Sequence, residues 1–161
     1  MQVAVCGPAA CTDDEARAAF AVGRLLARRG AIVLCGGGPG VMSAAAAGAR
    51  SADGLVVGIR PDRERGGPSK DMSVVVATDL GQARNAVLVA SADAVIAVGG
   101  SWGTLSELAL AMRRAHELPT GALPVVSLAG WRIVDAHGEA IPGVLHAETP
   151  DEAVTLALGP V

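Results

Sequence analysis

Lysine is almost absent from this chain of 161 residues: Lys70 is the only one, and it lies in the polar segment GGPSKD. An enzyme that uses pyridoxal phosphate needs a lysine to hold the cofactor as a Schiff base. A lone lysine in a charged loop does not suit that role. The sequence therefore excludes a pyridoxal-phosphate enzyme.

Aromatic residues, positive charge and long apolar runs are also scarce. The chain has two tryptophans, one phenylalanine, no tyrosine and a formal net charge of −3. A nucleic-acid surface needs a basic field and stacking rings, so we expect no nucleic-acid partner. The apolar runs have the length of strands and are broken by glycine or charge, which argues against a membrane span.

The sequence also lacks the spacing of a metal or disulfide site. Its three cysteines show no CxxC pair and its three histidines share no metal-ligand spacing, so we expect unpaired thiols and no bound metal. The first residues, MQVAVCGP, have no basic segment of a signal peptide and have the pattern of a strand. These features predict a cytoplasmic protein.

Short β-branched runs alternate with alanine-rich helical segments, which predicts parallel βαβ units. We expect one domain over residues 1–161, a doubly wound α/β fold with a mostly parallel, Rossmann-like sheet and helices on both faces. Thr12 and Thr149 are expected helix N-caps with capping boxes, and Asp79 is the expected N-cap of a short helix. The expected strands are residues 3–6, 31–35, 54–59, 73–77, 93–98 and 123–128, after which the pattern becomes less regular.

Two loops contain more glycine than a turn needs. Each runs from the carboxyl end of a predicted parallel strand into a helix, where open α/β sheets bind ligands and free N–H groups suit a phosphate. Turns alone also explain glycine, but two such loops in one sheet favour an anion site, although neither fits GxGxxG or the Walker motif. The first glycine loop contains Gly36, Gly37, Gly38 and Gly40; the second contains Gly99, Gly100, Ser101, Trp102, Gly103 and Thr104.

Two charged residues accompany these loops. Arg84 lies early in the short helix that Asp79 is expected to cap, whose first turn is expected at the same sheet edge, and its alternative role is a surface ion pair. Glu107 follows Thr104 by three residues, so it is either the glutamate of a capping box or a functional carboxylate. Trp102 either stacks on a ligand ring or packs against a neighbouring helix.

The segments CGGGPGVMSAAAAGA, GLVVGIRP and ARNAVLVASADAVIAVGGSWGTLSELALA resemble the Lonely Guy (LOG) superfamily, over roughly residues 3–126. That family was long mislabelled as lysine decarboxylases, a label that the single lysine contradicts here. Its enzyme members are phosphoribohydrolases, which cut a nucleoside 5′-monophosphate into free base and ribose 5-phosphate. The resemblance implies that Arg84 and Glu107 are the catalytic pair and that hydrolysis requires no cofactor.

Three positions depart from those enzymes and look more like a sister branch that includes molybdenum-cofactor carrier proteins. Gly99 stands where the enzymes have proline, Ser101 where they have glycine, and Asn85 where a lysine usually follows the arginine. The sequence thus predicts a phosphorylated, nucleotide-like ligand between the two loops, with Asn85 in the binding set.

Three functions remain open from the sequence. The spacing of Arg84 and Glu107 slightly favours hydrolysis of an N-glycosidic bond, because a pure phosphate binder has no use for a carboxylate beside its anion. The alternatives are a protein that binds and carries the molybdenum cofactor (molybdopterin) without catalysis, and a nucleotide sensor without turnover. We expect a homodimer or a tetramer.

Overall fold

The computed structural model of the chain describes residues 1–64, 70–119 and 122–160. Within these ranges the chain forms seven strands, five α-helices and one 3₁₀ turn. In chain order these are β1 (Gln2–Cys6), α1 (Asp13–Arg28), β2 (Ile32–Cys35), α2 (Val41–Arg50), β3 (Val56–Arg60), β4 (Val74–Ala77), η1 (Gly81–Ala83), α3 (Arg84–Ala90), β5 (Ala94–Val98), α4 (Trp102–Glu117), β6 (Val125–Leu128), β7 (Val144–Ala147) and α5 (Pro150–Leu158).

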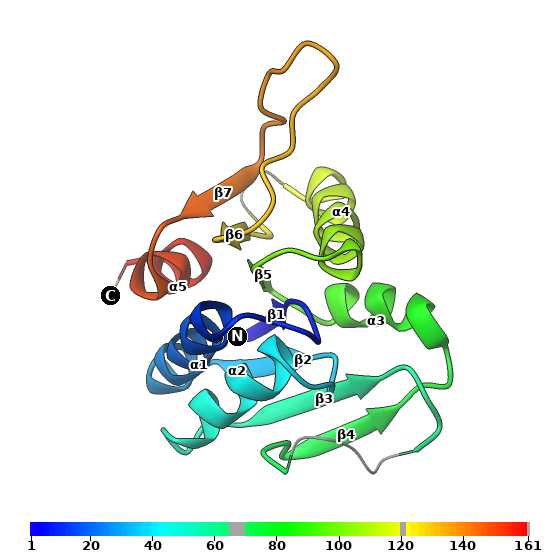
Figure 1. Ribbon diagram of the computed structural model, residues 1–161, viewed down its shortest axis with the longest axis vertical. Helices are drawn as coiled ribbons and strands as arrows, with labels where there is room; N and C mark the ends of the chain where they lie inside the picture. The colour runs from blue at the N-terminus through cyan, green and yellow to red at the C-terminus, as the bar shows by residue number, and fades with distance from the viewer. Residues whose placement is uncertain (65–69, 120–121, 161) are drawn as a thin grey trace.

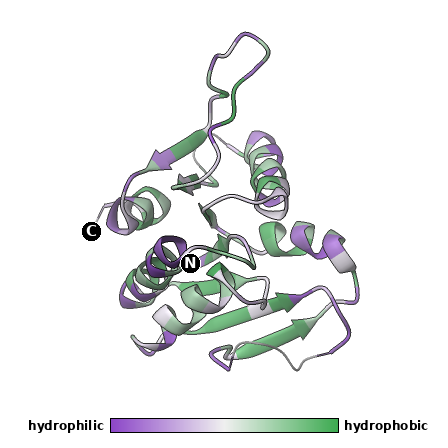
Figure 2. Cartoon of the chain, viewed as in Figure 1, coloured by the Kyte–Doolittle hydropathy of each residue, from purple (hydrophilic) through white to green (hydrophobic). Residues whose placement is uncertain are grey.

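The strands form one sheet in the order β4-β3-β2-β1-β5-β6-β7, and every neighbouring pair is parallel. Helices α1, α2 and α5 cover one face, and α3 and α4 cover the other (Figure 1). The central strand β5 is apolar and buried at every position, because both faces of the sheet are covered there. Most of the sheet is coloured as hydrophobic in Figure 2. The predicted doubly wound α/β fold is confirmed.

Small residues let the helices approach one another closely. A Cβ atom added to Gly48 of α2 would lie 1.9 Å from the carbonyl oxygen of Phe20 in α1, and one added to Gly23 would lie 2.0 Å from that of Ala45. The two helices therefore touch backbone to backbone. This contact fixes α2, and with it the first glycine loop, against the rest of the protein.

The sheet order reverses between β1 and β5, since the chain winds outward from β1 to β4 and then crosses to the other side. In open α/β sheets, ligands bind in the crevice outside the carboxyl ends of the strands at such a switch point. The first glycine loop follows β2 and the second follows β5, so the two loops flank the end of β1 at this edge.

Two of the three expected helix caps are present. Thr12 Oγ1 accepts from the N–H of Glu15, whose carboxylate accepts from the N–H of Thr12, so this capping box is present. Thr149 Oγ1 accepts from the N–H of Glu152, but the Glu152 carboxylate accepts from the N–H of Glu148, so the capping box expected at Thr149 is not closed. The prediction for Asp79 is wrong. Its φ of 56° is left-handed, Arg63 donates to its carboxylate, and the 3₁₀ turn η1 intervenes before α3 begins at Arg84.

The chain after β6 is more regular than the sequence indicates. Strand β7 pairs with β6 at the edge of the sheet, and residues 129–143 before it form an arm that projects from the body (Figure 1). A strand of four residues with exposed Leu145 and His146 has too weak a pattern to be recognised from sequence. Residues 65–69 of the charged loop lie outside the described residues. Among the described residues, no helix is long and apolar enough to cross a membrane.

Candidate functional site

The first glycine loop is shaped by what lies against it. A Cβ atom on Gly36 would fall 2.3 Å from Nη1 of Arg84, and one on Gly40 would fall 2.3 Å from the carbonyl oxygen of Ala9. Gly37 and Gly40 also have φ values of 68° and 66°, in the region that favours glycine. Glycine is required here because an arginine side chain and a second backbone segment lie too close to the loop to leave room for a Cβ atom.

Arg84 is the charged group at the centre of the site. It is buried, with 8% of its surface exposed, and neither Nε nor Nη1 has a hydrogen-bond partner among the described residues. Its nearest acidic atom is Oε1 of Glu107, 3.7 Å from Nη1. Leaving buried guanidinium donors without acceptors costs free energy, so this side chain is suited to receiving an anion.

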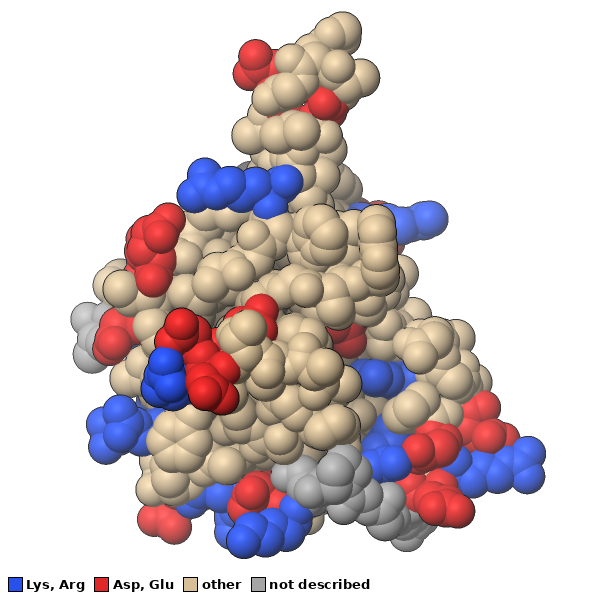
Figure 3. Space-filling view, viewed as in Figure 1, with Lys and Arg blue, Asp and Glu red and all other residues tan. Residues whose placement is uncertain are grey.

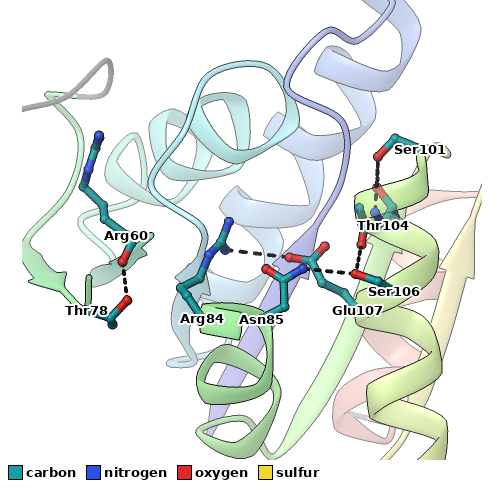
Figure 4. Close-up of polar contacts among 9 residues, drawn as sticks. Arg60, Thr78, Arg84, Asn85, Ser101, Thr104, Ser106 and Glu107 are labelled. Carbon is teal, nitrogen blue, oxygen red and sulfur yellow. Dashed lines mark hydrogen bonds and ion pairs between the residues drawn. The ribbon is translucent and has the colours of Figure 1, made fainter. Parts of the chain in front are cut away.

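Glu107 faces Arg84 from α4 (Figure 4). Burial raises the pKa of Glu107 to about 7, although the Arg84 guanidinium and a hydrogen bond from the Cys6 thiol both act to lower it. The capping-box interpretation of Glu107 is wrong, because the helix begins three residues earlier than that interpretation requires. Ser101 is the N-cap, and its Oγ accepts from the N–H of Thr104.

The second glycine loop is largely satisfied by its own contacts. The hydroxyls of Ser101 and Thr104 are hydrogen-bonded at 2.9 Å, and Nε1 of Trp131 donates to the carbonyl oxygen of Ser101 at 3.1 Å. A Cβ atom on Gly99 would lie 2.0 Å from a carboxylate oxygen of Glu15, so an acidic group already lies against this loop. Gly100 packs against Trp131. The anion-binding features are therefore stronger at the first loop.

The remaining predicted residues lie around this core. Asn85 is buried, donates from Nδ2 to Ser106 Oγ at 3.1 Å, and has no partner for Oδ1 among the described residues. Trp102 is 80% exposed and packs its ring against Trp131, with centroids 5.7 Å apart. A Cβ atom on Gly103 would meet only Ser101 Oγ, at 3.7 Å. Because Trp102 is largely exposed and contacts Trp131 on one side, the other face of its ring is free.

A hollow of about 290 Å³ lies beside the first loop and Arg84. Figure 3 shows a recess in this face of the molecule in which basic and acidic atoms lie close together beneath uncharged surface. Sequence reasoning missed one charged residue of this hollow, Arg60, although its place directly after a predicted strand could have indicated it. The lining consists of Gly36, Gly37, Gly38, Pro39, Met42, Arg60, Pro61 and Arg84.

Across the described ranges, no three side chains of histidine, cysteine, aspartate or glutamate are placed to hold a metal ion. Cys6 and Cys35 are buried and unpaired, and burial raises the pKa of the Cys35 thiol to about 11.

Replacing Glu107 by glutamine is expected to change how stability depends on pH. A folded-state pKa of about 7, above the ordinary 4.5, means that the protonated carboxyl stabilises the fold below pH 4.5 and that this contribution is lost as the pH rises to about 7. The wild type should therefore lose about 3 kcal/mol relative to Glu107→Gln between those pH values. Urea unfolding at several pH values measures this difference.

The control for this experiment is Glu117→Gln, which changes an exposed carboxylate on the same helix. Its unfolding free energy should follow that of the wild type. If the curves for wild type and Glu107→Gln run parallel from pH 4 to pH 8, the burial of an ionisable Glu107 is contradicted.

The sequence and the fold of this chain are similar to those of known proteins. The sequence matches the model of the SLOG cluster4 family over residues 1–154. It is 40% identical over 141 residues to an uncharacterised protein of Archaeoglobus fulgidus, covering 88% of this chain and 92% of that one. Two solved structures are also similar over nearly their whole length, and their names refer to the molybdenum cofactor.

The first is the molybdenum cofactor binding protein of the phototrophic bacterium Rippkaea orientalis. It superposes with a TM-score of 0.81 at 32% identity, covering 96% of this chain and 93% of that one. The second is the molybdenum cofactor carrier protein of Chlamydomonas reinhardtii, with a TM-score of 0.78 at 28% identity and the same coverage of 96% and 93%.

Proposed function

This chain belongs to the SLOG cluster4 family, and from that premise we propose that it binds the molybdenum cofactor through the cofactor's phosphate, as a carrier without catalysis. In this proposal the phosphate binds at the first glycine loop and Arg84. The proposal reverses the slight preference of the sequence for a hydrolase.

One observation carries the phosphate site: Arg84 is buried, and its Nε and Nη1 lack hydrogen-bond partners among the described residues. A phosphate oxygen accepts strong, charge-assisted hydrogen bonds from a guanidinium. The adjoining helix α2 begins at Gly40 without a side-chain cap, and although the N–H of Val41 donates to the carbonyl oxygen of Pro8, the positive end of the helix dipole adds to the attraction. A neutral acceptor would form weaker hydrogen bonds with the guanidinium and would leave its charge uncompensated.

The carrier function is supported by the second glycine loop and by the relatives. Ser101 and Thr104 use their hydroxyls on each other, and Glu15 lies against Gly99, so this loop is poorly prepared for a second phosphate contact. Two full-length structural relatives are named for binding or carrying the molybdenum cofactor. The free face of Trp102 offers a stacking surface for the pterin ring.

Glu107 is compatible with a bound phosphate. A carboxylate beside an anion is repulsive when ionised, but a pKa of about 7 allows the carboxyl to be neutral near neutral pH. Phosphate binding next to it should raise this pKa further. Glu107 then donates a proton in a hydrogen bond instead of repelling the ligand.

A second candidate function is the hydrolysis of a nucleoside 5′-monophosphate. The observation that favours it is the 3.7 Å contact between Arg84 and Glu107, which joins the two residues that the LOG resemblance marks as catalytic. In that reaction Glu107 would stabilise an oxocarbenium-like transition state or orient the attacking water, and Arg84 would hold the phosphate or ribose. No metal takes part in this scheme.

The wider setting follows from the same features. We infer a single cytoplasmic domain without a nucleic-acid or membrane partner, in keeping with the acidic charge balance. A homodimer or tetramer is favoured by the projecting arm, where Val134 and Ile141 are exposed.

A binding and turnover experiment separates the two functions. The purified protein is titrated with molybdenum cofactor and, separately, incubated with a panel of nucleoside 5′-monophosphates while free base is followed by chromatography. We expect tight binding of the cofactor, no release of base, and retained cofactor binding by Glu107→Gln. Release of base that both Arg84→Ala and Glu107→Gln abolish would establish the hydrolase instead.

A further inference from the structure

A second arginine lies on the same glycine loop as Arg84. A Cβ atom on Gly37 would fall 2.9 Å from Cγ of Arg60, and Nη1 of Arg60 donates to the carbonyl oxygen of Gly37 at 3.3 Å. Arg84 lies in the same way against Gly36, and neighbouring Cα atoms are only about 3.8 Å apart. Two arginine side chains therefore lie against successive glycines of the loop.

The two arginines reach the hollow from different elements. Arg60 ends β3 and Arg84 begins α3, as Figure 4 shows, and both line the hollow of about 290 Å³. Thr78 Oγ1 donates to the carbonyl oxygen of Arg60 at 2.7 Å, which ties the backbone of Arg60 to the segment after β4. The position of Arg60 is thus fixed by the sheet.

Asp62 holds the guanidinium of Arg60 but does not use all of its donors. Asp62 accepts from Nε at 2.9 Å and from Nη2 at 2.6 Å, and its own side chain is 45% exposed. A guanidinium has five N–H donors, so two remain after the bonds to Asp62 and Gly37. The Arg60 side chain is only 13% exposed, so those donors have limited access to water.

We propose that Arg60 and Arg84 together bind two linked anionic groups, so that a ligand in which two phosphates are linked binds more tightly than a ligand with a single phosphate. The inference rests on the proposed phosphate site and extends it. Arg84 binds the first phosphate, and Arg60 binds the second across Gly36 and Gly37. Asp62 keeps Arg60 in place when no ligand is bound and turns toward solvent when the second phosphate arrives.

Inorganic phosphate and inorganic pyrophosphate are the probes that test this inference, with affinities measured by calorimetry on the purified protein. We expect the wild type to bind pyrophosphate at least about tenfold more tightly than phosphate, because each charge-assisted contact contributes at that level. Arg60→Gln should remove most of this preference, because it weakens the binding of pyrophosphate more than that of phosphate. Asp62→Asn should increase the preference, because the amide is uncharged and keeps only one acceptor for the two Arg60 donors that Asp62 holds.

The control is Arg63→Ala, which removes an exposed arginine that pairs with Asp79 nearby. It should keep the wild-type ratio of the two affinities. An equal ratio in wild type, Arg60→Gln and Asp62→Asn would overturn the diphosphate inference while leaving the phosphate site standing. Failure of the wild type to bind either anion, or unchanged binding in Arg84→Ala, would overturn the phosphate site itself.

Discussion

Arg84→Ala is expected to weaken the binding of a phosphorylated ligand by at least about a hundredfold. Removing one partner of a buried, hydrogen-bonded charge pair costs about 2–5 kcal/mol, and about 2.7 kcal/mol corresponds to a factor of one hundred. Arg84 is the buried cation of the site and has donors available for the ligand. Calorimetric titration with molybdenum cofactor measures the change directly.

The loss should come from the missing contact and not from unfolding. Arg84 contributes little to stability in the absence of ligand, because two of its nitrogen atoms lack partners among the described residues. The thermal midpoint of Arg84→Met should therefore stay close to that of the wild type. Arg84→Lys should also bind poorly, since an ammonium cannot reproduce the planar fork. Affinity within threefold of the wild type in a folded Arg84→Ala protein would remove this residue from the site.

Gly48→Ala is expected to destabilise the protein by about 2–3 kcal/mol, although alanine is normally preferred over glycine in a helix by about 0.5–1 kcal/mol. The added methyl group would lie 1.9 Å from the carbonyl oxygen of Phe20, so α1 and α2 would have to separate. Because α2 follows directly from the first glycine loop, ligand affinity should fall as well. Urea unfolding measures the loss of stability.

Gly103→Ala is the matched control, since it makes the same change in a helix where there is room. Its methyl group would meet only Ser101 Oγ, at 3.7 Å. We expect a neutral or slightly stabilising effect. Equal stability changes for Gly48→Ala and Gly103→Ala would mean that the two helices do not meet backbone to backbone.

Much of the fold could be predicted from local patterns. The buried strand β5 is apolar at every position. The N-termini of α1 and α5 could be predicted because Thr12 and Thr149 are N-capping residues. Two features could not be predicted, because their local patterns are weak or misleading. Strand β7 has four residues and no alternating pattern, and Asp79 has the composition of a cap but a left-handed φ that only the surrounding contacts explain.

The sequence predicts a candidate site from its glycines, and it gives no signal for residues that only tertiary contacts bring there. The surplus of glycine at Gly36 and Gly37 reflects two arginines lying on the loop, but the sequence cannot show that one of them is Arg60. The carboxylate of Glu15 beside Gly99 is likewise invisible, because these residues are distant in the chain. Glu107 was assigned two alternative roles, and the N-cap at Ser101 excludes the capping role.

The most direct test of the carrier proposal is the mass spectrum of the small molecule that copurifies with the protein from cells that make the molybdenum cofactor. The account predicts a phosphorylated pterin in near-stoichiometric amount on the wild type, absent from Arg84→Ala. A nucleotide, a free base with ribose 5-phosphate, or a wild-type protein that carries no pterin would contradict it.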